Sequence, residues 1–427
     1  MKKADIGTAA EPYIVAASWL LSPHTDPVPG GAMLVSGGVI RETGTLKELK
    51  RRHALPLAEY PGCAIIPGFV NAHTHLELTH FPAWRIRNHA EYHPHRFVDW
   101  MILLVKIKRG LADDDFRASL QEGVHICLDS GTTSVGEIVS IPSVADSYSA
   151  SMLGGRLFFE VLGHDPLRFE KMLERAVAVM PEVETENMAC GVSPHAPYTI
   201  GDENYALVRE CARSKGLQMA IHLAESEAES ELVFSSSGEM ADVFYPFVSW
   251  SQYLVPPRRR SSTELLFRSG MLQPGMLAIH CVHVSRSDAE LLKRQGVTAV
   301  LCPRSNERLN VGRAPVALLK KLRVPMVLGT DSLASNDSLS MWDEMRFALD
   351  QFSGQFSPAE LFAMATSGGA SALGFAASRG TLEVGKRADF QVVGGIKGAK
   401  EAGQLTEQIV LHGCTQEVYA GGMRYAR

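Results

Sequence analysis

The middle of the chain alternates short apolar runs with stretches of helical character, and this alternation constrains the fold more than any other feature. The eight runs are CAIIPGFVNAH, GTTSVGEI, GRLFFEVLG, MACGVSPHA, LQMAIHLAE, MLAIHCVHV, VTAVLCPRSN and VPMVLGTDS. Helical stretches follow most of them. One is SRSDAELLKRQ after the sixth run, where Ser285 predicts an N-cap with Asp288 three residues later. Eight strand–helix units predict a (β/α)8 TIM barrel, with chemistry at the C-terminal ends of its strands.

Both ends of the chain have a different pattern. The pattern of the first ~60 and the last ~45 residues predicts short strands, separated by Gly-Gly pairs and Pro. We therefore expect residues 1–63 and 380–427 to form one small composite β-sandwich domain beside a barrel of residues 64–379. The start, MKKADIGTAAEPYIVAASWLLSP, is predicted to be a first strand rather than a signal peptide. Residues 227–263 form a long excursion after the fifth run, expected near the site as part of a lid.

Charge and cysteine usage exclude several classes of protein. The net charge is −5, so no basic field attracts nucleic acid or an anionic membrane. The seven cysteines are odd in number and form no C-x-x-C, which argues against a disulfide framework and a cysteine zinc site. No apolar run is long enough to span a membrane. These features predict a cytoplasmic protein without a nucleic-acid or membrane partner.

Histidines gather at the ends of the predicted strands. In NAHTHLELTHF, His73 and His75 follow an apolar run two residues apart, so on a strand they point to the same side. One such pair is compatible with two ordinary loop histidines. The strand ends, however, hold six of the fifteen histidines, together with Glu225 and Asp331. Imidazoles and carboxylates converging on one rim predict a divalent metal site.

Six strings in order resemble the deaminase and chlorohydrolase branch of the amidohydrolase superfamily: PGFVNAHTH, SPHAPYT, IHLAES, IHCVHV, CPRSN and LGTDSLASN. GTLEVGKRADF near the C-terminus resembles the return strand of that family. The resemblance implies that one divalent metal is bound by His73, His75, His222 and Asp331. One metal is expected because Pro194 and His195 stand where binuclear relatives carry a bridging lysine. Zinc is the expected ion, with iron or manganese as alternatives.

The resemblance also implies catalytic roles. Glu225 would move a proton from the attacking water to a ring nitrogen of the substrate, although its place in the acidic stretch ESEAESE also suits an exposed glutamate. His280 would hold the water or the developing oxyanion, with His283 as the competing histidine. Asp331 would bind the metal, accept the second proton and pass it to the leaving amine.

Four residues are expected to contact substrate. Glu77 is predicted to bind hydroxyl or amino groups, or else to form a salt bridge within the first loop. Trp100 resembles a family tryptophan that lines the pocket, with packing on a helix face as its alternative. His195 is a hydrogen-bonding candidate, and Asn306 is expected to orient the pocket from the seventh strand. The string HAEYHPHRF, with His89, His93 and His95, is interpreted as a surface loop rather than a second metal site.

These expectations converge on a metal-dependent hydrolytic deaminase that releases ammonia from a 6-aminopurine nucleoside-like substrate. NAHTHLELT is most similar to members that act on aminodeoxyfutalosine, while adenosine, methylthioadenosine and S-adenosylhomocysteine stay open. One alternative is hydrolysis of a C–Cl bond, another C–N bond or a cyclic amide in a different heterocycle. Another is a non-catalytic metal-binding barrel, against which the joint presence of Glu225, His280 and Asp331 argues. A homodimer is left as an open expectation.

Overall fold

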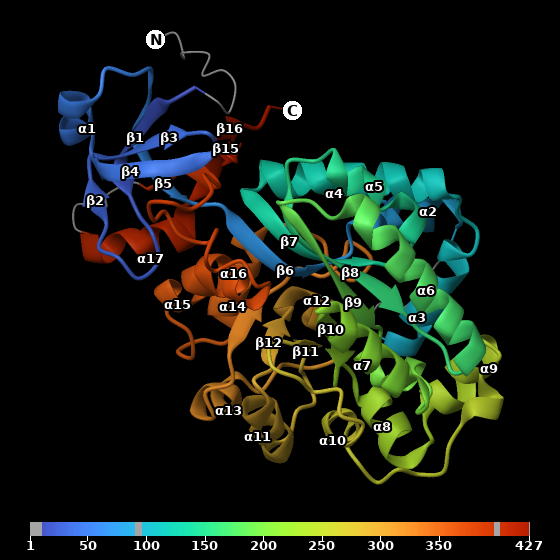
Figure 1. Cartoon of the computed structure of the whole chain (residues 1–427). Coiled ribbons are helices and arrows are strands. Elements are labelled where there is room, and N and C mark those ends of the chain that lie inside the picture. Colours follow the sequence, from blue (N-terminus) through green and yellow to red (C-terminus); the bar gives the residue numbers. More distant parts are fainter. Residues whose placement is uncertain (1–10, 90–95, 397–401, 427) are drawn as a thin grey trace.

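The computed structural model describes residues 11–89, 96–396 and 402–426, which form a barrel with a second sheet at one side (Figure 1). The barrel sheet has eight strands, each parallel to the next along the chain. They are β6 (Phe69–Thr74), β7 (Thr132–Val139), β8 (Gly154–Val161), β9 (Met188–Pro194), β10 (Gln218–Leu223), β11 (Leu277–His280), β12 (Thr298–Leu301) and β13 (Met326–Leu328). Each strand overlaps one of the eight apolar runs, so the predicted barrel is confirmed.

Polar contacts bring the first and last barrel strands together. Thr74, at the end of β6, forms a parallel bridge with Asp331, and its hydroxyl donates to the Asp331 carbonyl at 3.1 Å. Asn71 donates to the hydroxyl of Thr330 at 2.7 Å and accepts from its backbone N–H at 3.1 Å. These bonds nearly close the barrel at the point where two predicted metal ligands leave their strands.

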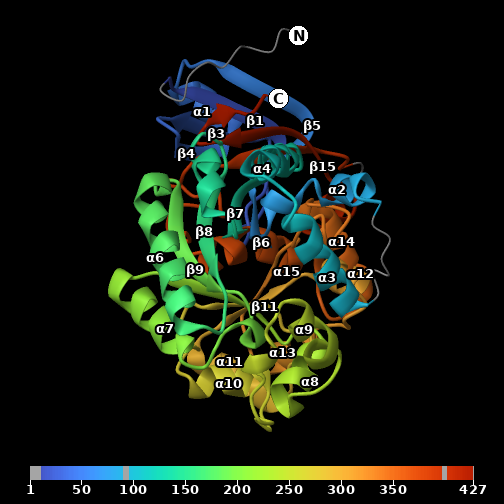
Figure 2. The same ribbon diagram turned by 90° about the vertical axis from the view of Figure 1, so that its right-hand side faces the viewer.

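Helices separate the barrel strands along the chain and pack around them (Figures 1 and 2). They are α2 (Phe81–Arg87), α3 (Phe97–Lys108), α4 (Asp113–Asp129), α5 (Asp146–Ser149), α6 (Pro166–Val183), α7 (Asn204–Lys215), α8 (Glu227–Ser235), α9 (Tyr245–Phe247), α10 (Ser262–Arg268), α11 (Arg286–Gln295), α12 (Pro303–Arg308), α13 (Val316–Lys321), α14 (Met341–Gln351), α15 (Pro358–Ala363) and α16 (Gly369–Ala372). The predicted N-cap of α11 is present, with both bonds of a capping box between Ser285 and Asp288.

The two ends of the chain meet in one mixed sheet, whose strand order is β16-β15-β14-β5-β1-β3-β4, with β2 paired to β1. Its strands are β1 (Tyr13–Leu20), β2 (Val28–Pro29), β3 (Gly31–Ser36), β4 (Val39–Thr45), β5 (Leu57–Pro67), β14 (Phe390–Gly394), β15 (Cys414–Ala420) and β16 (Met423–Arg424), accompanied by α1 (Leu46–Arg52) and α17 (Ala402–His412). Both views place this sheet on the side of the barrel away from α8 and α10 (Figures 1 and 2). The domain boundaries at 63/64 and 379/380 stay a prediction, and β5 itself runs on to Pro67.

Apolar side chains fill the barrel interior, as its parallel strands require. This inner cluster includes Val70, Ile138, Phe158, Ile279 and Val300, each from a different strand. The barrel is therefore a packed core rather than a channel, and polar groups are left to its rim. Among the described residues, no helix has both the length and the apolar character needed to cross a membrane.

Candidate active site

A cavity of about 500 Å³ lies at the C-terminal ends of the barrel strands. It brings together seven of the residues predicted from the sequence: His75, Trp100, His195, His222, Glu225, His280 and Asp331. His73 lies in the same cluster as these residues and is fully buried. Glu77 and Asn306 do not line the cavity, so the structure separates two predicted substrate contacts from the rest.

The four predicted metal ligands converge at this rim. His73 Nε2 and His75 Nε2 lie 3.5 Å and 3.7 Å from the same oxygen, Oδ1 of Asp331. His75 Nε2 lies 3.4 Å from His222 Nε2. Within the described residues, both ring nitrogens of His73 are buried without a hydrogen-bond partner. Because a buried polar atom without a partner is costly, this donor set fits a divalent cation, which would bind one of the two His73 nitrogens.

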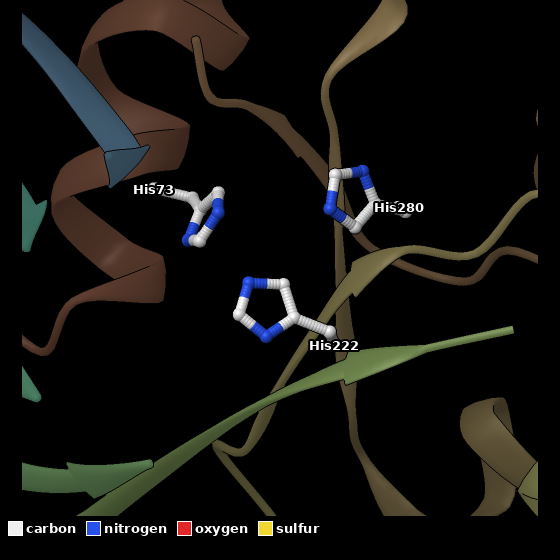
Figure 3. A group of neighbouring side chains, drawn as sticks. All are labelled: His73, His222 and His280. Carbon is white, nitrogen blue, oxygen red and sulfur yellow. The ribbon is translucent and has the colours of Figure 1, made fainter. Parts of the chain in front are cut away.

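His222 has one nitrogen fixed by the backbone. Its Nδ1 lies 2.8 Å from the carbonyl oxygen of His195, so Nδ1–H donates there and the Nε2 lone pair faces the cluster. Figure 3 shows the rings of His73, His222 and His280 around one common space. One nitrogen of each ring lies within 4.8 Å of the other two.

The carboxylate of Asp331 is held by two serines. Ser305 and Ser335 donate to its Oδ2 at 2.7 Å and 2.6 Å, which leaves Oδ1 facing the histidines. Although burial opposes it, the neighbouring His73 and the other histidines hold the pKa of Asp331 well below its usual range. Its φ of +60° is unusual for a residue with a side chain, and such backbone strain is concentrated at functional sites.

The turn after β10 presents Glu225 to the cavity. A second carboxylate, Glu229 of α8, accepts the backbone N–H groups of Ala224 and Glu225, both at 2.9 Å. Ala224 is in the left-handed region with φ +51°, so the turn needs this support. Burial, aided by the charges of Asp331 and Glu229, raises the pKa of the Glu225 carboxyl well above its usual range. This environment favours the protonated form of the Glu225 carboxyl over the charged form.

His280 and His283, the two candidates on the sixth strand, occupy different places. His280 is buried in the cavity wall, and its Nε2 lies 3.5 Å from Glu225 Oε1. Its Nδ1 lies 2.9 Å from Oδ1 of Asn306, which places Asn306 behind the histidine. His283 is exposed and lies 2.7 Å from the carbonyl of Val311. The geometry favours His280 and gives Asn306 a contact that positions this histidine, while the substrate contact of Asn306 stays a prediction.

Glu77 accepts hydrogen bonds from a loop beside the cavity. It is almost completely buried, and its Oε2 accepts the backbone N–H groups of Ser140 and Ile141 at 3.1 Å and 3.3 Å. Its Oε1 lies 3.4 Å from Nζ of Lys108. The structure therefore places Glu77 in a salt bridge, the alternative considered for it, although the partner comes from α3. It reaches the cavity only through Lys108, which lines it.

Trp100 and His195 both line the cavity. Trp100 also donates its indole N–H to the carbonyl of Ala334 at 2.9 Å. Its side chain therefore both lines the pocket and packs against the protein, so the two interpretations are compatible. His195 Nδ1 lies 3.1 Å from the hydroxyl of Thr199. Burial, together with the charge of Lys108, lowers the pKa of His195 to about 4, so its ring is neutral at physiological pH.

Several cavity residues were missed from the sequence. Glu160 interrupts the apolar run GRLFFEVLG one residue before the end of β8, and a lone carboxylate near a strand end was an available signal. Phe244, Val248 and Trp250 come from the predicted excursion 227–263, which contributes a wall of the cavity. Phe244 ends the π-helix η4 (Met240–Phe244), and Val248 and Trp250 lie in the segment that follows α9. Of the histidines predicted in a surface loop, His89 is exposed, and His93 and His95 lie outside the described residues.

Comparison with known proteins gives the same architecture. Residues 64–420 match the amidohydrolase family. An aminodeoxyfutalosine deaminase from Deinococcus radiodurans is 29% identical over 355 residues, covering 81% of this chain and 82% of that protein. The Helicobacter pylori aminofutalosine deaminase, solved with methylthio-coformycin, superposes with a TM-score of 0.84 at 24% identity, covering 97% of this chain and 100% of the other. An adenosine deaminase from Xanthomonas campestris with bound zinc has a TM-score of 0.80 at 23% identity, covering 96% and 92%.

Proposed function

The chain belongs to the amidohydrolase family, and on that premise we propose that it is a metal-dependent deaminase that releases ammonia from the 6-amino group of a purine nucleoside. The observation that carries the proposal is the buried pair Glu225 and His280. Oε1 of Glu225 lies 3.5 Å from Nε2 of His280, beside a cluster of side chains suited to a metal. Relatives named as aminodeoxyfutalosine and adenosine deaminases support the substrate class. The finer proposal, aminodeoxyfutalosine, rests on the NAHTHLELT string and the Deinococcus relative.

Four residues would hold the cation: His73, His75, His222 and Asp331. Three neutral imidazoles and one carboxylate suit zinc, which is the ion we propose. When bound, such a cation supplies a Lewis acid that lowers the pKa of water toward neutrality. The hydrogen bonds to His222 Nδ1 and to Asp331 Oδ2 fix the orientation of two of these ligands.

The chain's own acids and bases account for the proton transfers. Glu225 takes one proton from the attacking water and donates it to a ring nitrogen of the purine, which makes the adjacent carbon electrophilic. His280, with its Nδ1 proton held by Asn306, presents Nε2 to the attacking water from the side of Glu225. Asp331 accepts the water's remaining proton and passes it to the leaving amine. Water and the amine are consumed, and a ring carbonyl and ammonia are produced.

Ammonia release by the zinc-loaded protein tests the proposal. The panel holds aminodeoxyfutalosine, adenosine, methylthioadenosine, S-adenosylhomocysteine, guanine and cytosine. A purine nucleoside turned over with kcat/KM of ~10⁵ M⁻¹s⁻¹ or more supports the deaminase and identifies its substrate. Release from none of them contradicts the purine deaminase and directs attention to chlorinated heterocycles and cyclic amides.

A pair of variants tests the proposed role of Glu225. Glu225→Gln keeps the size of the side chain and removes the transferable proton, so we expect kcat to fall by roughly 10²–10⁴-fold with zinc content unchanged. Glu227→Gln, an exposed position two residues away, is the matched control and should retain activity. Full activity in Glu225→Gln would overturn the assigned proton path.

A further inference from the structure

Glu344 of α14 is a buried carboxyl that has no part in the chemistry above. Its side chain is fully buried, and it does not belong to the set of residues that line the cavity. It contacts the start of α12 and also Asn336, in the turn after β13. We propose that Glu344 is a positioning residue that holds α12, the helix that carries Ser305 and Asn306. This inference rests on the proposed function, and it is tested partly by zinc binding, which needs no turnover.

The first turn of α12 depends on an acceptor from outside the helix. In the part of the chain that the structure describes, its N-cap residue Cys302 forms no side-chain hydrogen bond to the helix, and Pro303 has no N–H to donate. The next N–H, that of Arg304, donates to Oε1 of Glu344 at 2.9 Å. Because the first N–H groups of a helix have no acceptor within it, the carboxyl from α14 acts as the missing cap.

The next two residues of α12 carry contacts to the site. Ser305 donates to Oδ2 of Asp331 at 2.7 Å. Oδ1 of Asn306 lies 2.9 Å from Nδ1 of His280. Both side chains lie within two positions of the N–H that the α14 carboxyl accepts, on a helix of six residues. So short a helix is not stable by itself, and a shift of its first turn therefore moves both contacts together.

The same carboxyl also contacts the turn that follows Asp331. Its Oε2 lies 3.4 Å from Nδ2 of Asn336, and that Nδ2 donates to the carbonyl of Thr330 at 2.8 Å. Oδ1 of Asn336 accepts from Nε of Arg304 at 3.3 Å. One network therefore joins the start of α12 to the residue before Asp331, whose φ is +60°. Such a strained backbone persists only where its surroundings hold it.

Packing alone does not account for a carboxyl at this position of α14. Burial raises the pKa of Glu344 to about 8, and the N–H and the charge of Arg304 oppose that rise. A leucine of similar size would carry no such penalty. The hydrogen bonds that the carboxyl accepts from α12 and from the turn after β13 supply the reason for it.

Three substitutions separate the position of this carboxyl from its charge. Glu344→Gln keeps the side-chain length and the oxygen that accepts the Arg304 N–H, so kcat should stay within about threefold of wild type. Glu344→Asp keeps the charge but is one methylene shorter, and Glu344→Leu removes the acceptor. In both, we expect kcat at saturating zinc to fall by roughly 10–100-fold, with KM changed by less than about threefold. Asp350→Asn, exposed on α14, is the control and should keep the wild-type kcat.

Zinc affinity, measured by competition with a chelator, reports on the contact to Asp331 without turnover. Glu344→Asp should weaken zinc binding by roughly tenfold, and Glu344→Gln should not. Ser305→Ala removes the hydroxyl that donates to Asp331 and should weaken it by a similar factor. If Glu344 acts through Ser305, the double variant should bind zinc little more weakly than either single variant.

Three results would overturn the positioning role and leave the deaminase standing. They are wild-type kcat and zinc affinity in Glu344→Asp, a loss in Glu344→Gln as large as in Glu344→Asp, and fully multiplicative losses of zinc affinity in the double variant. If Glu344→Leu does not fold, the Asp and Gln substitutions still give the comparison. If the wild-type chain releases ammonia from no adenine nucleoside, the proposed function fails, and the zinc measurements by themselves support or overturn the positioning role.

Discussion

The turn that carries Glu225 depends on Glu229, and removing that carboxylate should damage stability and turnover together. In Glu229→Ala, the backbone N–H groups of Ala224 and Glu225 lose acceptors that now lie at 2.9 Å. A hydrogen bond to a charged group contributes about 1.5–3 kcal/mol, so two give about 3–6 kcal/mol. Relief of the buried charge, whose desolvation raises the pKa of Glu229, offsets part of this. We expect a net loss of about 2–4 kcal/mol in the free energy of unfolding.

Turnover in the same variant should fall because Glu225 is no longer held in place. A displacement of about 1 Å at a catalytic group costs roughly 10²-fold, so kcat should fall by about that factor with zinc content unchanged. Urea denaturation and ammonia release on the zinc-loaded protein measure the two effects. Glu231→Ala, exposed on the same helix, is the control and should change stability by less than ~0.5 kcal/mol. Glu229→Ala with a wild-type midpoint and wild-type kcat would refute the reasoning.

Three further outcomes are expected. Removal of the metal by a chelator should abolish ammonia release and lower the denaturation midpoint, and added zinc should restore both; activity that survives complete metal loss would contradict the site. Asn306→Ala should lower kcat by roughly 10–100-fold at constant zinc content, because His280 loses the acceptor 2.9 Å from its Nδ1, and an unchanged kcat would remove that positioning contact. Burial lowers the pKa of His164 to about 4, so its contribution to stability is present above about pH 6.5 and is lost as the pH falls toward 4. Urea denaturation at pH 7 and pH 5 tests this. Since the ring is partly exposed, the free energy of unfolding of the wild-type chain should fall by about 1–2 kcal/mol more than that of His164→Gln over this range. An equal fall in both proteins would refute the assignment.

Local periodicity made the barrel and much of its rim predictable. Eight apolar runs specified eight parallel strands, because a strand buried on both faces is apolar at nearly every position. His73 and His75 are two residues apart, so their side chains point to the same face of the strand. That inference needs no knowledge of the rest of the fold. The roles of His222, Glu225 and Asp331 came from resemblance of short strings to a family, and they stay proposals for this chain.

The partners of the remaining polar side chains were decided by tertiary structure. Glu77 lies close in sequence to His75, yet the loop after β7 and the end of α3 pair with it from 63 and 31 residues away. Likewise, only the tertiary structure shows that Asn306 on α12 contacts His280 at the end of β11, and that His283 contacts the carbonyl oxygen of Val311.

The sequence alone therefore determined which residues stand at the strand ends, because period and spacing are local properties of a backbone. The tertiary structure alone decided which of those side chains face the cavity and which support them from behind. That depends on loops and helices converging from distant parts of the chain, and on where each buried polar atom finds its partner.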